Sequence, residues 1–115
     1  MPVLDSDSPE VEVAPGFQRR ELVSGERGSE SLTVADATLV PNGQAPLHTH
    51  PTEEAMVILE GEAVAWLGDD TITVTKGQTV LAPAGVKHGF TNKSGKPVRI
   101  MAIFPTGKVE RTLVE

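Results

Sequence analysis

The sequence predicts an all-β domain, a sandwich or a barrel of short strands, on three observations. Its 11 glycines and 9 prolines are spread through the chain and separate short apolar runs, which is the pattern of strands joined by turns. No stretch carries an apolar face at i, i+3, i+4 and i+7 that is long enough for a core helix. A length of 115 residues fits one compact domain and not two.

Short apolar and β-branched runs between turn residues mark the predicted strands. Residues 67–71 have the composition of a hairpin turn, and residues 41–43 and 83–85 are further turn signals. Regularly spaced strands of this kind are typical of a sandwich or a barrel. In chain order, the predicted strands are 18–23, 31–40, 55–59, 63–67, 71–74, 79–82, 89–92 and 98–104.

The ends of the chain are less regular than its centre. We expect residues 1–9 to form a flexible acidic tail and residues 10–115 to form the single domain. Residues 108–115 are either a last strand or a second tail, and the sequence does not decide between these two.

The last predicted strand, 98–104, carries apolar side chains on both faces. A strand that is buried on both sides can face a partner surface, which predicts a homodimer. A loop or the N-terminal segment covering the outer face is an equally good interpretation. One face holds Val98, Ile100, Ala102 and Phe104, and the other holds Met101 and Ile103.

Charge and composition exclude several classes of function. The net charge of -6 disfavours nucleic acid and anionic membrane surfaces as partners. The absence of cysteine excludes disulfides, thiolate nucleophiles and cysteine metal sites. No apolar run approaches the ~20 residues of a membrane span, and the acidic N-terminus lacks the apolar region of a secretory signal. A cytoplasmic location is therefore the default expectation.

The chain has three histidines, and two of them, His48 and His50, are two residues apart. On an extended strand both imidazoles point to the same face. Two neighbouring imidazoles repel once they are protonated, and a shared cation removes that conflict. A solvated pair in a loop is the alternative interpretation, and by itself the pair is a modest signal for a metal.

A carboxylate and the third histidine extend this signal. Glu54 follows the break at Pro51, so it begins the next strand and can point back toward the histidine face. A carboxylate beside imidazoles suits a divalent transition ion. Glu53 and Glu54 are otherwise a solvated acidic pair at a turn, and His88 is otherwise an exposed loop histidine.

These residues resemble the two sequence motifs of the cupin superfamily. The first motif places a glutamate after an HxH pair and a glycine six residues later. The second combines glycine, PxG, histidine and asparagine at fixed spacing. One position departs from the pattern, because Gly43 stands four residues before the first histidine where the family usually has five. The matching residues are His48, His50, Glu54 and Gly61 in the first motif and Gly77, Pro83, Gly85, His88 and Asn92 in the second.

The resemblance implies a cupin double-stranded β-helix, a conical jelly-roll barrel with one divalent metal ion inside. It implies His48, His50, Glu54 and His88 as the metal ligands, and Glu54 in preference to Glu53. Asn92 lies on the strand face of His88, where its amide could tie down the following loop. Fe²⁺, Mn²⁺, Ni²⁺, Cu²⁺ and Zn²⁺ all accept such ligands, and the sequence does not choose among them.

The remaining residues limit the chemistry. An open metal position permits oxygen activation, polarisation of a carbonyl group or activation of water. All three histidines serve as ligands and the chain has no tyrosine, so we assign the chemistry to the metal. Metal-independent sugar epimerases of the superfamily use a histidine base and a tyrosine acid, which disfavours that class here. The arginines form no obvious inward set in the sequence, namely Arg19, Arg20, Arg27, Arg99 and Arg111.

Strand parity suggests a pocket lining. Met56 and Ile58 share the face of Glu54, and Phe90 shares that of His88. An apolar pocket of this kind suits a small organic substrate, although plain core packing explains each residue equally well. We expect a metal-dependent enzyme, with a dioxygenase-like oxidoreductase favoured and a lyase or isomerase as a variant. The alternative is a non-catalytic barrel that binds a metal or a small ligand.

Overall fold

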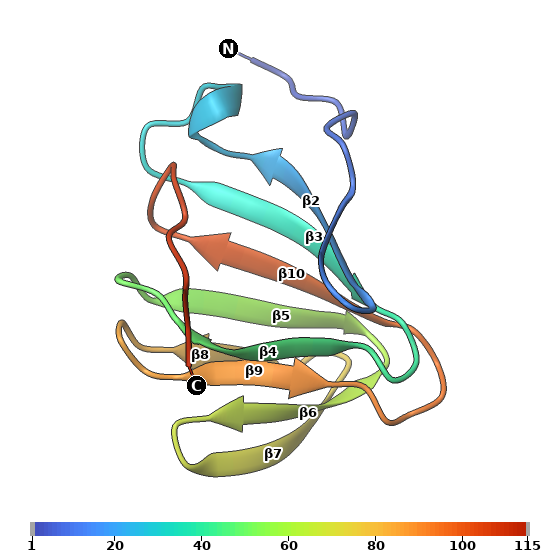
Figure 1. Cartoon of the computed structure of the whole chain (residues 1–115). Coiled ribbons are helices and arrows are strands. Elements are labelled where there is room, and N and C mark those ends of the chain that lie inside the picture. The colour runs from blue at the N-terminus through green and yellow to red at the C-terminus, as the bar shows by residue number, and fades with distance from the viewer. Residues whose placement is uncertain (1, 115) are drawn as a thin grey trace.

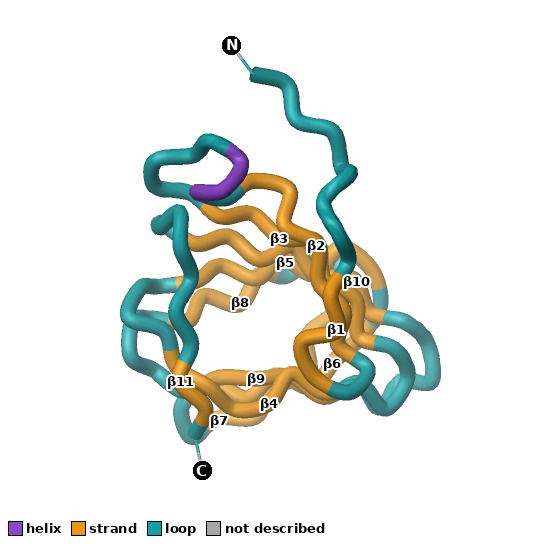
Figure 2. The backbone as a smooth tube through the Cα atoms, turned by 45° about the horizontal axis from the view of Figure 1, so that its top comes forward, coloured by secondary structure: helices purple, strands orange, loops and turns teal. Residues whose placement is uncertain are grey.

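The computed structural model describes residues 2–114 and contains two antiparallel sheets that face each other (Figure 2). One sheet has the strand order β1-β2-β3-β10-β5-β8, and the other has the order β11-β4-β9-β6-β7. A single 3₁₀ turn, η1 (Gly25–Arg27), follows β2. The strands are β1 Val11–Ala14, β2 Phe17–Val23, β3 Thr33–Leu39, β4 Gln44–Thr49, β5 Glu54–Glu60, β6 Glu62–Leu67, β7 Asp70–Thr75, β8 Thr79–Ala82, β9 His88–Thr91, β10 Val98–Phe104 and β11 Thr112–Leu113.

The all-β prediction is confirmed, and each of the eight predicted strands overlaps an observed one. Two observed strands, β1 and β4, were not predicted. In the C-terminal segment, Thr112 and Leu113 form the short strand β11, which pairs with β4. The described residues include no helix long and apolar enough to cross a membrane.

The core lies between the two sheets and is formed by alternate residues of their strands. In β3 and β10 every second residue is buried and the others are half-buried, as expected for strands with one face toward a core. Phe90 on β9 lies opposite Ala45 on β4 and Ala65 on β6. These small cross-strand neighbours leave room for the aromatic ring in the interior.

The half-buried outer face of β10 includes Met101 and Ile103. This agrees with the apolar pattern from which a homodimer was expected, and the dimer remains a prediction.

Glycines occupy the turns that the motifs predicted. Gly61 has a φ of 88°, and a Cβ there would lie 2.7 Å from the Pro97 carbonyl oxygen. A residue other than glycine is therefore disfavoured both by the positive φ and by this close contact. Gly43 packs against the backbone of Gly16 without space for a side chain. Gly43 stands one residue closer to the first histidine than the family pattern has it, but the turn still requires a glycine at this position.

Asn92 fixes the loop between β9 and β10. It is fully buried, and its Nδ2 donates to the carbonyl oxygens of Leu39 and Lys96, at 3.0 and 2.6 Å. Its Oδ1 accepts from the backbone N–H and the hydroxyl of Ser94. The prediction that this amide ties down the loop is confirmed.

The two terminal segments lie apart, because the N-terminal one leads into β1 of one sheet and the C-terminal one ends beside β4 of the other (Figures 1 and 2). After β10, the C-terminal segment crosses from one sheet to the other and pairs with β4. The N-terminal segment 2–9 has no strand or helix, and Arg27 donates to the carbonyl oxygen of Asp5 at 2.7 Å and to the Asp7 carboxylate at 2.9 Å. The flexibility expected for residues 1–9 remains a prediction, and residue 1 lies outside the described residues.

Candidate metal centre

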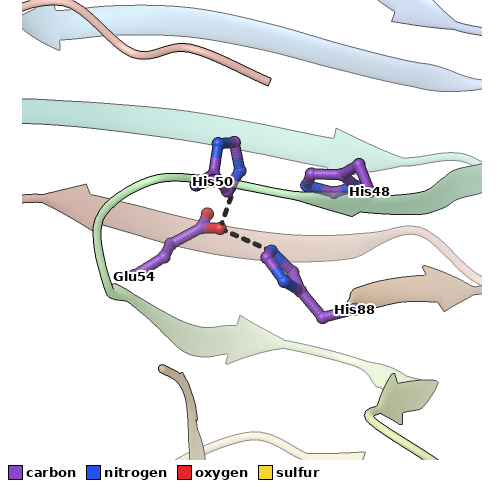
Figure 3. Close-up of side chains that lie close together, drawn as sticks. All are labelled: His48, His50, Glu54 and His88. Atoms are coloured by element: carbon purple, nitrogen blue, oxygen red, sulfur yellow. Dashed lines mark hydrogen bonds and ion pairs between the residues drawn. The ribbon is translucent and has the colours of Figure 1, made fainter. Parts of the chain in front are cut away.

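Three strand ends bring the predicted ligands together. His48 lies near the end of β4, and His50 directly follows that strand. Glu54 begins β5 and His88 begins β9. Because His48 lies opposite His88 in the register of β4 and β9, residues 40 positions apart become neighbours. Figure 3 shows the four side chains converging on one point between the sheets.

The atoms of these four residues that could ligate a metal lie within 4.8 Å of one another, and all four residues are buried. The imidazole centroid of His48 is 4.7 Å from that of His50 and 4.4 Å from that of His88. One carboxylate oxygen of Glu54 is 2.8 Å from Nε2 of His88 and 3.3 Å from Nε2 of His50. This spacing brings all four groups within reach of a single ion.

The far nitrogen of each imidazole is held by a backbone carbonyl oxygen. Nδ1 of His48 donates to Pro46 at 2.6 Å, that of His50 to Glu110 at 2.7 Å, and that of His88 to Val86 at 3.0 Å. A carbonyl oxygen can only accept, so each Nδ1 carries the hydrogen. When neutral, each ring would present the lone pair of Nε2 to the centre, an arrangement found in histidine metal sites. Without a metal, the 2.8 Å contact between Nε2 of His88 and the Glu54 carboxylate is a hydrogen bond and needs a proton between these two atoms.

Three Nε2 lone pairs and one carboxylate therefore converge on one buried point, and all are acceptors. Such a set requires a proton or a cation between its members. The donor chemistry fits a divalent transition ion with nitrogen and oxygen ligands. The residues His48, His50, Glu54 and His88 could hold such an ion together.

The protonation equilibria reflect the same arrangement. Burial lowers the pKa of His48 to about 4, so this ring is neutral near pH 7. Burial also acts to lower the pKa of His88, but its hydrogen bond to Glu54 outweighs burial and raises the pKa. Burial acts to raise the pKa of Glu54, and hydrogen bonds from His50 and His88 overcome it and lower the pKa. Both shifts, the raised pKa of His88 and the lowered pKa of Glu54, favour a proton on His88 beside an ionised Glu54.

A cavity of about 40 Å³ adjoins the centre. Its volume is near that of one or two water molecules. Met56 and Phe90 line the cavity, as the pocket prediction had it, whereas Ile58 lies in the core and does not border it. Most of the remaining wall is apolar, formed by Val13, Phe17, Ala37, Ala45, Ile100, Ala102 and Phe104.

Two arginines, Arg19 and Arg111, also border this cavity. The expectation that the arginines form no inward set was wrong for these two. Arg19 points inward because of its position on β2, and Arg111 is brought to the cavity by the pairing of β11 with β4. Sequence reasoning also missed Phe104, whose ring lies edge-on to His50 with 4.9 Å between the ring centroids.

The family and the fold follow from comparison with known proteins. The sequence model of the cupin domain family matches residues 35–104, so the chain belongs to the cupin domain family. That span contains all four candidate ligands, so the predicted resemblance and the jelly-roll fold are confirmed. Comparison with curated proteins gives no significant match.

Among solved structures, the polyketide cyclase RemF from Streptomyces resistomycificus is similar with a TM-score of 0.81 and 25% sequence identity. The match covers 100% of this chain and 87% of that one. Oxalate decarboxylase from Bacillus subtilis has a TM-score of 0.84 at 20% identity, and a formate complex of the Lactobacillus farciminis enzyme has 0.83 at 17%. These matches cover 94% of this chain but only 30% and 34% of the decarboxylase chains, and they carry the fold alone.

Proposed function

We propose that this protein is a metal-dependent enzyme that acts on a small organic molecule. The observation that supports the proposal is the convergence of four acceptor groups at a buried cavity, with each imidazole oriented by a backbone carbonyl oxygen. A purely structural cluster would have no need to leave a cavity beside it. The enzyme's metal would be held by His48, His50, Glu54 and His88.

When bound, a divalent ion would supply Lewis acidity and, for a redox-active metal, electron transfer to dioxygen. The chain's own residues set the conditions for that chemistry. Met56, Phe90 and Phe104 form an apolar wall that limits the entry of water and strengthens electrostatic interactions inside. The carbonyl oxygens of Pro46, Glu110 and Val86 keep the three rings in a fixed tautomer and orientation.

Within residues 2–114, no separate proton-transfer group borders the cavity. Besides His48, His50 and Glu54, the charged side chains that line it are Arg19 and Arg111, and guanidinium groups do not deprotonate in proteins. The chain has no tyrosine or cysteine. The chain's contribution is therefore to bind, orient and exclude water.

A dioxygenase-like oxidoreductase is the reaction class that we favour from the ligand set. The protein would be reconstituted anaerobically with Fe²⁺ and then mixed with dioxygen and a panel of phenolic and thiol substrates. We expect oxygen uptake that depends on both the metal and the substrate. Iron, nickel, copper and manganese would each be tried, because affinity order does not identify the working metal. No uptake with any of them would exclude the oxidoreductase.

A cyclase, lyase or isomerase is the second candidate, and the similarity to the polyketide cyclase RemF over the whole chain supports it. Such reactions need Lewis acidity and no dioxygen. Substrate conversion by the metal-loaded protein under anaerobic conditions would favour this class. Metal binding without turnover under either condition would instead favour a non-catalytic binding module.

A further inference from the structure

A second, larger cavity lies beside the metal centre, and we call it the outer chamber. Its volume is about 300 Å³, near the lower limit for small-molecule sites. Val13 and Arg19 border both the outer chamber and the 40 Å³ cavity, so the two spaces adjoin at these residues. The chamber is lined by Ser8, Pro9, Val11, Val13, Arg19, Glu21, Ser24, Glu26 and Arg27.

Arg19 stands between the outer chamber and the metal centre. Its guanidinium carbon is 5.6 Å from the centroid of the Phe104 ring, and that ring contacts His50. The Arg19 side chain is 21% exposed. A positive charge is thus held at the junction by an aromatic face that itself packs on a candidate metal ligand.

The hydrogen-bonding capacity of Arg19 is largely unused. Its buried Nε has no acceptor among the described residues. The guanidinium contacts one carboxylate, that of Glu21, at a long 3.4 Å, and the Glu21 side chain is 42% exposed. A buried N–H without an acceptor is unfavourable, and a guanidinium pairs well with a carboxylate through two parallel hydrogen bonds.

The other cation of the outer chamber is already occupied. Arg27 donates to the carbonyl oxygens of Asp5, Glu21 and Leu22 and to the carboxylate of Asp7. These bonds hold the N-terminal segment over the chamber. Of the two arginines that line the chamber, Arg19 is therefore the one able to bind a ligand.

We propose that Arg19 is the specificity-determining residue of this site and binds the carboxylate of a small organic anion. The body of the anion occupies the outer chamber, and the end that reacts enters the smaller cavity beside His48, His50, Glu54 and His88. The chamber volume suits an anion of about the size of one aromatic ring. The part of this proposal that places the reacting end at a metal centre rests on the proposed function. Binding of the anion itself requires only Arg19.

Glu21 competes with such an anion because its carboxylate already contacts Arg19. Removing the Glu21 charge should therefore strengthen anion binding, whereas removing the Arg19 charge should weaken it. Glu26 also lines the chamber and keeps the local charge near balance, so an anion needs the direct Arg19 contact. Opposite effects at two neighbouring positions on β2 are difficult to produce by general destabilisation.

The experiment uses benzoate as the probe and benzamide as its neutral match. Binding would be measured by ligand-observed NMR with the full chain, in the metal-free form and in a form loaded with Zn²⁺. The variants are Arg19→Gln, Arg19→Lys and Glu21→Gln. Arg20→Gln is the matched control, because Arg20 is the next residue on β2, borders neither cavity and loses the same charge.

We expect benzoate to bind more tightly than benzamide, and its Kd to rise at least about tenfold in Arg19→Gln. The Kd of benzoate should be unchanged in Arg20→Gln and lower in Glu21→Gln. In Arg19→Lys it should lie between the values of the wild type and Arg19→Gln. Equal loss in Arg19→Gln and Arg20→Gln, equal binding of the two probes, or no benzoate binding at millimolar concentration would each overturn the proposal. The metal-free arm reports on Arg19 alone, whereas failure of the proposed function appears separately as absence of bound Zn²⁺.

Discussion

The metal centre and the outer chamber adjoin each other but are built in different ways. The centre is formed at the ends of β4, β5 and β9, its four side chains are buried, and backbone carbonyl oxygens orient each imidazole. The outer chamber is lined by β1, β2 and η1 and is bordered on one side by Ser8 and Pro9 of the N-terminal segment, which has no regular structure and accepts hydrogen bonds from Arg27. Rigid strand ends suit atoms that must stay fixed around an ion, whereas an outer wall can vary with the substrate.

The largest expected effect is stabilisation of the metal centre by its ion. A ligand that binds only the folded chain at a thousandfold excess over its Kd adds about 4 kcal/mol to the free energy of unfolding. We expect Zn²⁺ to raise the melting temperature of the wild-type protein and to have little effect on His50→Ala. Differential scanning calorimetry with and without the ion measures this. Equal shifts in the two proteins would place the ion elsewhere.

The second effect concerns the loop at the far end of β9. Asn92→Ala removes a buried amide that donates to two carbonyl oxygens and accepts from Ser94, and we expect a loss of about 3 kcal/mol. Chemical denaturation would measure it, with the exposed neighbour Lys93→Ala as the control. Metal affinity should be retained in both, because Asn92 contacts none of the ligands. A cost no larger than that of Lys93→Ala would show that the amide does not hold the loop.

The third effect is the pH dependence of metal affinity. The raised pKa of His88 means that a proton must leave this ring before an ion can bind. His48, with a pKa of about 4, is already neutral. Affinity should therefore fall about tenfold for each pH unit below the pKa of His88 and level off above it. Competition with a chelator at several pH values measures this, and an affinity independent of pH from about 5 to 8 would contradict it.

The smallest effect lies in the outer chamber. Arg27→Ala removes the hydrogen bonds that hold the N-terminal segment, but Asp7 is 75% exposed and its ion pair is weak. We expect a loss of about 1 kcal/mol, faster amide exchange in residues 3–9 and unchanged metal affinity. Lys76→Ala, at an exposed position, is the charge-matched control. Loss of metal binding in Arg27→Ala would mean that the two regions are not independent.

The sequence predicted the four candidate ligands better than strand β4, which carries His48 and leads to His50. The spacing of His48, His50, Glu54 and His88 was readable because each ligand sits at a strand end next to a proline or glycine turn. Strand β4 was missed because its sequence includes Pro46 and lacks the alternation of a strand. The structure accommodates Pro46 where the register of β4 and β9 is irregular, and its carbonyl oxygen accepts from His48.

The two arginines at the 40 Å³ cavity could not be predicted in this way. Arg19 and Arg111 are 92 positions apart in the numbering, and only the closing of the sheets brings both to one cavity. Strand parity gives the face of a residue on its own strand but not its distance from a site on another sheet. Ile58 illustrates the same limit, since it shares the face of Glu54 but lies farther along β5, in the core.

The central claim, that Glu54 and three histidines bind one ion per chain, is tested most directly by titrating metal-free protein with Zn²⁺ in a calorimeter. Glu53→Ala is the matched control, because Glu53 is the exposed neighbour of the buried Glu54. The account predicts one site per chain in the wild type and in Glu53→Ala, and an affinity at least about 100-fold lower in Glu54→Ala. Equal affinity in Glu53→Ala and Glu54→Ala, or no binding by the wild type, would contradict it.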